Sequence, residues 1–273
     1  MIDIFLNRLD VISILKKNYN RIVMKKESKK TEYMSIPVCS SEKVAQLQNK
    51  ATILAEKKSF KEAISTYLSS VFIDKNNPKT YLGLGICYKN AGKIQKAIKA
   101  LEKAALLDPD NYEIFFNLGQ CHLEDEVPCK AIKCFIRALQ IEPDNPEGIY
   151  HLGLAHEACD EPDMAIMIYQ KLIECSPTYI NAYLKKSELL IKTQQYDNAL
   201  DLYKKVIKIN PNYTQTYFDI GLCLDKLGKQ REAKRYYHKF LAARPNDENA
   251  HYVMRRVENL KKLPKSQMRL SIV

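Results

Sequence analysis

The sequence has no tryptophan, only eight glycines among its 273 residues, and no stretch approaching the roughly 20 consecutive apolar residues that cross a bilayer. It also lacks patterns that carry common chemistry: a glycine loop that cradles phosphate, an H-E-x-x-H motif, and two cysteines separated by two residues. We therefore expect no membrane-spanning helix, no cofactor and no catalytic activity.

What the sequence does contain is a period of 34 residues. A glycine recurs at one point of the period, with serine in the single gap: Gly85, Gly119, Gly153, Ser187 and Gly221. Another point always holds alanine: Ala63, Ala97, Ala131, Ala165, Ala199 and Ala233. Proline marks a third point: Pro109, Pro143, Pro177, Pro211 and Pro245. Because no insertion or deletion breaks this register, each period must repeat one supersecondary structure that stacks on its neighbours.

Residues 78–111 show what one period contains. Tyr81, Leu84 and Tyr88 fall on the same face of a first helix, and Gly92 ends it. A second helix follows with an apolar stripe formed by Ile94, Ala97, Ile98, Leu101, Ala104 and Ala105. The glycine and alanine columns predict that the two helices approach each other closely, since a larger side chain there would force them apart.

The next period, residues 112–145, presents the same pattern as Phe115, Leu118, Gly119, His122, Ala131, Phe135, Ala138 and Pro143. These residues resemble the tetratricopeptide repeat family. The resemblance implies an all-α fold, a right-handed α-solenoid of helix-turn-helix repeats closed by a C-terminal capping helix. It places six repeats at residues 44–77, 78–111, 112–145, 146–179, 180–213 and 214–247. The fifth repeat departs from the pattern at Lys186 and Ser187, and the first has no proline at Lys75.

The formal net charge of +11 belongs mainly to the two ends of the chain. Residues 1–43 hold nine Lys or Arg against five Asp or Glu, and residues 251–273 hold six against one. We expect residues 1–43 to form a leader with an amphipathic helix over residues 2–24. This helix would cover the first repeat or lie on a membrane surface, and overall a poorly packed leader is favoured. A third alternative is that translation of the natural protein starts at Met24 or Met34.

Residues 248–263 are predicted to form the capping helix, and residues 264–273 a basic tail. The apolar side of the helix would hold Ala250, Val253, Val257 and Leu260, and its outer side Arg255, Arg256 and Lys261. Such a cap covers the apolar face that the last repeat would otherwise expose to water.

In the tetratricopeptide repeat family the first helices line a concave groove. The resemblance therefore implies a peptide-binding groove formed by Leu82, Ile86, Phe116, Asn117, Gln120, Tyr150, His151, Leu154, Leu184, Lys185, Phe218 and Leu222. Its centre is apolar and its edge mixed, and an exposed apolar stripe usually marks a binding surface. We expect an extended or helical peptide with apolar side chains as the ligand. The alternative is that these side chains fill gaps between neighbouring helices.

The leading functional hypothesis is thus a non-enzymatic scaffold or adaptor that binds a partner protein or peptide in this groove. An alternative is a regulatory or targeting module whose basic ends contact a membrane surface or nucleic acid. No chaperone-type carboxylate clamp is expected, because its Lys, Asn, Asn, Lys and Arg positions read Gln48, Thr52, Gly83, Glu113 and Asn117. The identity of the partner and the oligomeric state are left open.

The eight cysteines are predicted to be free thiols. Cys87, Cys121 and Cys223 share one repeat position that suits a small apolar side chain. The nearest approach to a zinc site is the set Cys121, Cys129 and Cys134 with His122 or His156, which scatters over different helix faces, so we expect no metal. Buried free thiols are typical of a reducing compartment, and the first residues do not fit an export signal, so we expect a cytoplasmic protein.

Overall fold

The computed structural model describes residues 38–261, and these residues form thirteen α-helices and no strand. The predicted amphipathic helix over residues 2–24 and the basic tail over residues 264–273 lie outside the described residues. Of the described residues, 44–261 belong to one compact unit. The helices are α3 (Val38–Glu56), α4 (Phe60–Ile73), α5 (Pro78–Asn90), α6 (Ile94–Leu107), α7 (Tyr112–Glu124), α8 (Pro128–Ile141), α9 (Pro146–Ala158), α10 (Pro162–Cys175), α11 (Ile180–Lys192), α12 (Tyr196–Ile209), α13 (Thr216–Lys226), α14 (Gln230–Ala243) and α15 (Ala250–Lys261).

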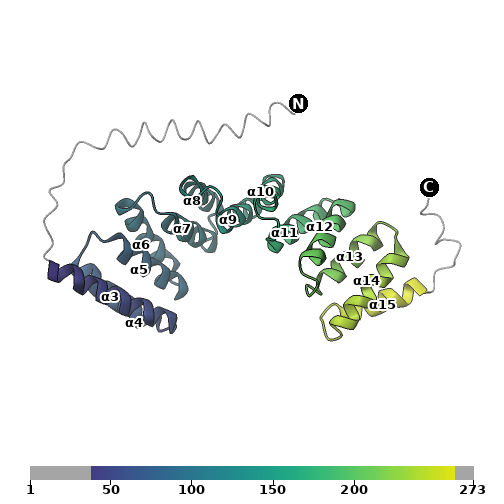
Figure 1. Ribbon diagram of the computed structural model, residues 1–273, viewed down its shortest axis with the longest axis horizontal. Coiled ribbons are helices and arrows are strands. Elements are labelled where there is room, and N and C mark those ends of the chain that lie inside the picture. The colour runs from purple at the N-terminus through teal and green to yellow at the C-terminus, as the bar shows by residue number, and fades with distance from the viewer. Residues whose placement is uncertain (1–37, 262–273) are drawn as a thin grey trace, which may run out of the picture. The chain divides into compact units, whose positions relative to one another are not determined.

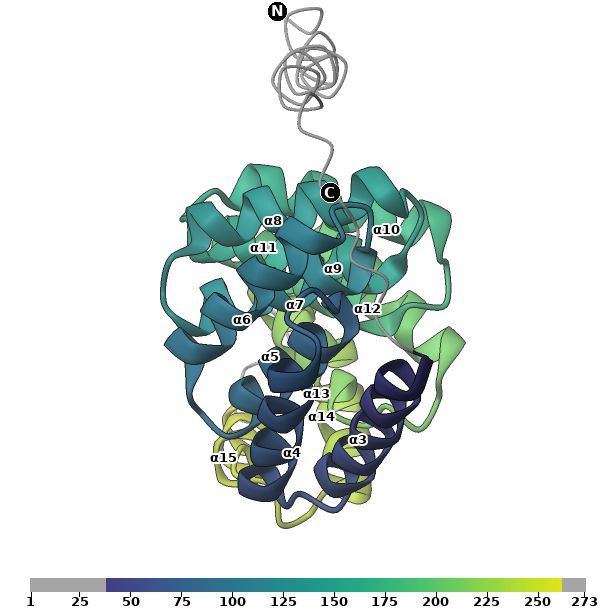
Figure 2. The same ribbon diagram turned by 90° about the vertical axis from the view of Figure 1, so that its left-hand side faces the viewer.

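The prediction of an all-α solenoid of helix-turn-helix repeats is confirmed. From α4 to α15 each helix packs against the next one in the chain (Figure 1). The first helices of neighbouring repeats also contact one another, α5 with α7 and α7 with α9. Figure 2 shows the stacked helices from the end at which α4 and α5 lie. None of the helices within residues 38–261 is both long and apolar enough to cross a membrane.

The turn inside each repeat has the same backbone geometry whatever residue occupies it. One residue per turn lies in the left-handed region, with φ between 57° and 74°: Lys58, Gly92, Glu126, Asp160, Gln194 and Gly228. Glycine adopts this conformation at the lowest cost, and only two of the six turns have it. The packing of the two helices that follow and precede the turn therefore outweighs the local preference of a residue such as Glu126.

Helix starts are defined by asparagine and proline. The side chains of Asn77, Asn111 and Asn145 each accept a hydrogen bond from a backbone N–H in the first turn of α5, α7 and α9. Pro128 and Pro162 are the first residues of α8 and α10, where the missing N–H would have no helical partner. Tyr179 stands at the asparagine position before α11 and makes no side-chain cap.

The small-residue columns are where the two helices of each repeat meet. All six alanines of the repeat column are fully buried: Ala63, Ala97, Ala131, Ala165, Ala199 and Ala233. A Cβ atom on Gly119 would lie 2.6 Å from Cε1 of Phe135, and one on Gly153 would lie 2.4 Å from Cε1 of Tyr169. Ser187 keeps the close approach in the fifth repeat because its Oγ donates a hydrogen bond back to the carbonyl of Tyr183, at 2.7 Å.

The last helix, α15, is fixed by apolar burial and by one ion pair. Val253, Val257 and Leu260 are buried. Arg256 donates to both carboxylate oxygens of Asp225, Nε to Oδ2 at 2.6 Å and one terminal nitrogen to Oδ1 at 2.7 Å. The prediction that Arg256 lies on the outer side was wrong, because this two-pronged contact turns it toward α13, whereas its neighbour Arg255 is exposed.

Substituting Gly119→Ala should destabilise the protein although alanine favours helix more than glycine does. Overpacking against Phe135 costs about 1–3 kcal/mol, and the gain in helix propensity is about 1 kcal/mol, so we expect a net loss of about 1 kcal/mol in urea unfolding. The matched control is the same substitution in a Phe135→Leu background, where the contact is relieved and the cost should shrink. An equal cost in both backgrounds would contradict the steric explanation.

Candidate functional site

The twelve predicted groove residues all lie on first helices. They are Leu82 and Ile86 on α5; Phe116, Asn117 and Gln120 on α7; Tyr150, His151 and Leu154 on α9; Leu184 and Lys185 on α11; Phe218 and Leu222 on α13. Because α5, α7 and α9 contact one another in turn, the residues of these three helices form a continuous row across neighbouring repeats.

The side chains of this row are less exposed to solvent than those of an open apolar binding surface would be. Leu82 and Asn117 are buried, and the other ten side chains are half-buried. The most exposed large apolar side chains of the described residues lie on second helices instead, Phe72 at 84% and Leu106 at 80%. The predicted groove therefore offers partial surfaces of many side chains rather than whole ones.

Its aromatic residues pack against neighbouring helices, both within a repeat and across repeats. Phe116 stacks on Tyr112, with ring centroids 5.5 Å apart, and meets the edge of His151 at 5.0 Å. Phe218 lies 5.5 Å from Phe240. These aromatics thus fill gaps between helices, as the alternative to binding predicts, while their outer edges remain accessible.

Leu154 and Leu222 behave differently from the aromatics. Both are half-buried, and neither belongs to a buried apolar cluster formed within residues 38–261. Of the predicted apolar groove residues, these two contribute least to the core and are the best suited to contact a ligand.

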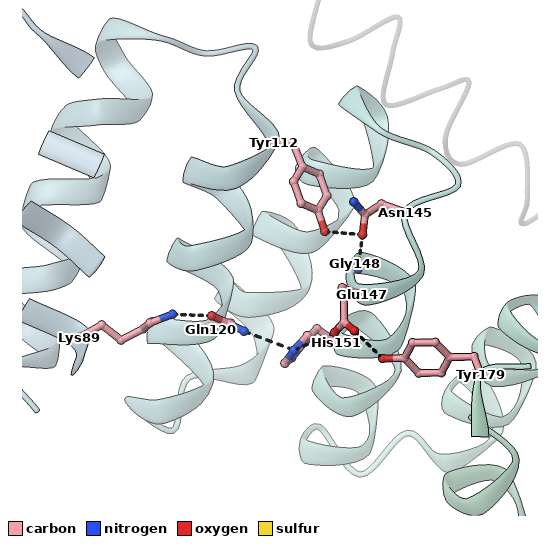
Figure 3. A network of polar contacts seen from close by, with 8 residues as sticks. All are labelled: Lys89, Tyr112, Gln120, Asn145, Glu147, Gly148, His151 and Tyr179. Carbon is pink, nitrogen blue, oxygen red and sulfur yellow. Dashed lines mark hydrogen bonds and ion pairs between the residues drawn. The ribbon is translucent and has the colours of Figure 1, made fainter. Parts of the chain in front are cut away.

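A polar chain crosses the groove from the second repeat to the fourth (Figure 3). Lys89 Nζ donates to Asn117 Oδ1 at 2.8 Å and to Gln120 Oε1 at 2.5 Å. The Gln120 amide nitrogen lies 3.3 Å from His151 Nε2. Burial lowers the pKa of Lys89 and that of His151, which favours the neutral imidazole as hydrogen-bond acceptor. The chain fixes three groove side chains in single positions.

Glu147 extends this polar chain toward the fifth repeat. Its carboxylate lies 4.0 Å from His151 Nε2 and accepts a hydrogen bond from the Tyr179 hydroxyl at 3.0 Å (Figure 3). In the same view Tyr112 donates to Asn145 Oδ1, which also accepts from the Gly148 N–H at the start of α9. Glu147 is thus the acidic neighbour of His151, whereas Glu188 on the next first helix pairs with Lys185.

Lys185 is shared between two carboxylates. Its Nζ lies 3.8 Å from Glu157 and 3.3 Å from Glu188. Glu157 also accepts a hydrogen bond from the Tyr169 hydroxyl at 2.5 Å. Burial lowers the pKa of Lys185, but Glu157 and Glu188 outweigh burial and raise it above the ordinary value. Lys185 is therefore a firmly charged part of the polar edge.

The sequence interpretation missed Lys89, Glu157 and Asp225, which occupy one repeat position and reach the next repeat. Lys89 contacts Asn117 and Gln120, Glu157 contacts Lys185, and Asp225 contacts Arg256. A charged residue recurring at that position at the end of the first helix was the signal that could have identified them.

Asp219 on α13 has no such contact. It is half-buried, and within residues 38–261 no hydrogen bond or ion pair reaches its carboxylate. Burial and, secondarily, the charge of Glu188 raise the pKa of Asp219 to about 7. An unpaired carboxylate on a groove helix is the most perturbed acidic group that the described residues contain.

The cysteines and histidines considered for zinc are not gathered. Within residues 38–261 no group of three or more His, Cys, Asp and Glu side chains is arranged to hold a metal ion. Burial raises the pKa of Cys121 and of Cys134 to about 11, which disfavours the thiolate that a metal needs. His156 instead binds the carboxylate of Glu161 at 2.6 Å through Nδ1.

Comparisons with known proteins identify the same type of repeat. Two tetratricopeptide repeat family models match, over residues 78–111 and over residues 190–257. A crystal structure of MamA protein is 28% identical, has a TM-score of 0.57, and covers 64% of this chain and 94% of its own. A search of curated proteins by sequence gives no match.

Two further solved structures share the fold at lower identity. PilW, described as a widely conserved type IV pilus biogenesis factor, is 17% identical, with a TM-score of 0.65 and coverage of 77% of this chain and 98% of its own. YrrB, described as a TPR protein with an unusual peptide-binding site, is also 17% identical, with a TM-score of 0.58 and coverage of 69% and 97%.

Asp219→Asn should remove a pH dependence of stability. The folded state keeps a proton on Asp219 up to about pH 7, whereas the unfolded chain releases it near pH 4, so stability of the wild type should fall as pH rises between these values. Urea unfolding at pH 5 and pH 8 should show a smaller fall in the variant and higher stability at pH 8. The exposed Asp201→Asn is the control and should follow the wild type, and Asp219→Asn behaving like this control would contradict the assignment.

Cys129 and Cys159 should form a disulfide on mild oxidation, because their Sγ atoms lie 3.5 Å apart in neighbouring repeats and Cys129 is exposed. Oxidised glutathione would accept the two electrons, and the two thiols would lose two protons. Non-reducing peptide mass spectrometry should detect the Cys129–Cys159 cross-link in the wild type and not in Cys159→Ser. Preferential cross-linking of any other pair would show that this distance is not maintained in solution.

Proposed function

Because this chain is a tetratricopeptide repeat protein, we propose that it is a non-enzymatic scaffold that holds a peptide segment of a partner protein along its first helices. The proposal covers the groove residues predicted from the sequence and adds Lys89 as the group that positions Asn117, Gln120 and, through Gln120, His151.

The observation that carries the proposal is a half-buried apolar row held beside a fixed polar edge. Leu154 and Leu222 present apolar surface without being needed in the core. Gln120, His151 and Lys185 lie on the same series of first helices, in positions that hydrogen bonds and ion pairs restrict. A ligand that buries the leucine side chains would meet polar groups that lose little freedom on binding, which favours specific recognition.

The ligand that fits this surface is an extended or helical peptide with apolar side chains. It would contact the accessible edges of Phe116 and Tyr150 and the side chains of Leu154 and Leu222. Since each aromatic is already packed against neighbouring helices, only its edge can contact the peptide. Binding energy would therefore come from many such partial contacts and from the fuller contacts of Leu154 and Leu222.

The double substitution Leu154→Asn/Leu222→Asn tests the groove with little change in volume or in the core. Affinity capture from native lysate, quantified by mass spectrometry, should retain a specific partner on the wild type and reduce it at least tenfold on the double variant. The matched control is Leu106→Asn, which changes a leucine that is 80% exposed on the second helix α6, and it should bind like the wild type. Circular dichroism checks that all three proteins remain helical.

Equal retention by the groove variant, with loss on Leu106→Asn, would contradict the groove and place the binding surface on the second helices. Retention that survives both variants but disappears at high salt would favour the alternative, in which the basic ends contact an acidic partner.

A further inference from the structure

Repeats five and six enclose a pocket of about 760 Å³ beside the groove. It is lined by residues of α11, α12 and α13, by the loop that precedes α13, and by residues at and after the end of α14. Two carboxylates face it, Glu188 from α11 and Asp219 from α13, together with Tyr203 from α12 and Thr216 at the start of α13.

The repeat pattern explains why Asp219 has no partner. In three other places a residue near the end of a first helix reaches polar groups on the next first helix, as in the contacts Lys89–Asn117, Glu157–Lys185 and Asp225–Arg256. The equivalent residue before Asp219 is Ile191, which has no polar atom to offer. Asp219 thus has the position of a cross-repeat partner without the group that would pair with it.

Thr216 provides a second, independent observation. Its side chain is 0% exposed, it lines the same pocket, and its hydroxyl oxygen has no hydrogen-bond partner. Thr80 occupies the equivalent position in the second repeat, and there the hydroxyl is bonded to Gln48 at 2.7 Å and to Ser70 at 3.2 Å.

The two partners of Thr80 are replaced by apolar residues around Thr216. Leu184 occupies the repeat position equivalent to that of Gln48, and Val206 the position equivalent to that of Ser70. Buried polar groups are nearly always paired, so the pocket holds two polar groups, a carboxylate and a hydroxyl, that the protein itself does not satisfy.

The cations beside the pocket are already paired with carboxylates. Lys185 is the cation nearest Glu188, at 3.3 Å, but it is shared with Glu157. Arg244 also lines the pocket, and its guanidinium is held by Asp247 at 3.3 Å and by the side-chain oxygen of Gln215 at 2.8 Å. Arg244 is therefore already neutralised, whereas the Asp219 carboxylate is not.

We propose that this pocket receives an arginine side chain of the partner peptide, whose guanidinium bonds to the Asp219 and Glu188 carboxylates. The inference rests on the proposed function, since the same peptide would lie along the groove. Guanidinium supplies five donors in a planar fork, which allows it to meet two carboxylates at once. The partner would then combine apolar side chains for the groove with one arginine for the pocket.

A random dodecapeptide library displayed on phage tests the inference without knowledge of the partner. The wild type should select peptides that contain apolar residues and a recurrent arginine. Asp219→Asn should select apolar peptides in which the arginine preference is lost. Apolar selection without arginine on the wild type would overturn the pocket inference and leave the groove intact. Failure of the wild type to select any family would overturn both, whereas an identical selection by Leu154→Asn/Leu222→Asn would overturn the groove.

A selected peptide then allows a quantitative test. Replacing its arginine by citrulline, which keeps the shape and removes the charge, should weaken binding to the wild type at least tenfold and to Asp219→Asn less than twofold. Equal losses for the two proteins would show that the arginine binds elsewhere. Asp201→Asn is the control and should respond like the wild type.

The affinity for the arginine peptide should also depend on pH. Ionised Asp219 binds the cation, so affinity should rise from pH 6 to pH 8 in the wild type and stay constant in Asp219→Asn. The other titratable or charged groups around Asp219 are Glu188 and Lys185 on α11, Tyr203 on α12, Cys223 on α13, and Arg244 after α14. Burial raises the pKa of Cys223 to about 12 and raises that of Tyr203 as well, so neither loses its proton in this range. The same pH response in Asp219→Asn would overturn the role of this carboxylate.

Discussion

The close approach of the two helices within each repeat is the constraint on which the rest of the structure depends. A missing Cβ at Gly119 or Gly153 lets the aromatic ring of the second helix lie directly on the first helix. The fully buried alanine column does the same from the other side. Because this contact recurs every 34 residues, it fixes the spacing of the helices and keeps every groove residue in register with its neighbours. The turns adapt to it, which is why Glu126 and Asp160 adopt a left-handed backbone that glycine would adopt more easily.

Polar contacts between repeats form a second layer of specificity on the groove side. Lys89, Glu157 and Asp225 join successive first helices, and the pair Asp225–Arg256 also attaches the last helix. Such contacts stabilise one arrangement of neighbouring repeats, because leaving one member buried without its partner would be costly. This kind of contact is missing at Asp219, because the residue that would reach it from the preceding first helix is the apolar Ile191. In the proposed complex, the arginine of the ligand pairs with the Asp219 carboxylate, which the neighbouring repeat leaves without a partner.

The groove therefore combines two kinds of surface. Its aromatic residues pack against neighbouring helices within and across repeats, so they define the shape of the groove more than they offer exposed area. Leu154 and Leu222 lie outside the buried apolar clusters of the described residues, and the acidic pocket lies beside α13. Under the proposed function, the ligand is recognised by a pattern of small pockets along a row of helices, rather than by one deep cavity.

The sequence by itself determined the fold and the register of the groove, because a 34-residue period with small residues at fixed points permits one way of stacking helix pairs. It also placed Phe116, Tyr150 and Lys185 on the first helices. It did not determine how exposed these side chains are. It also did not reveal that Arg256 turns inward to Asp225, or that Asp219 and Thr216 line the same pocket without hydrogen-bond partners. Burial and pairing depend on which side chains of neighbouring repeats meet in space, and only the tertiary structure brings those residues, some 30 positions apart in the chain, into contact.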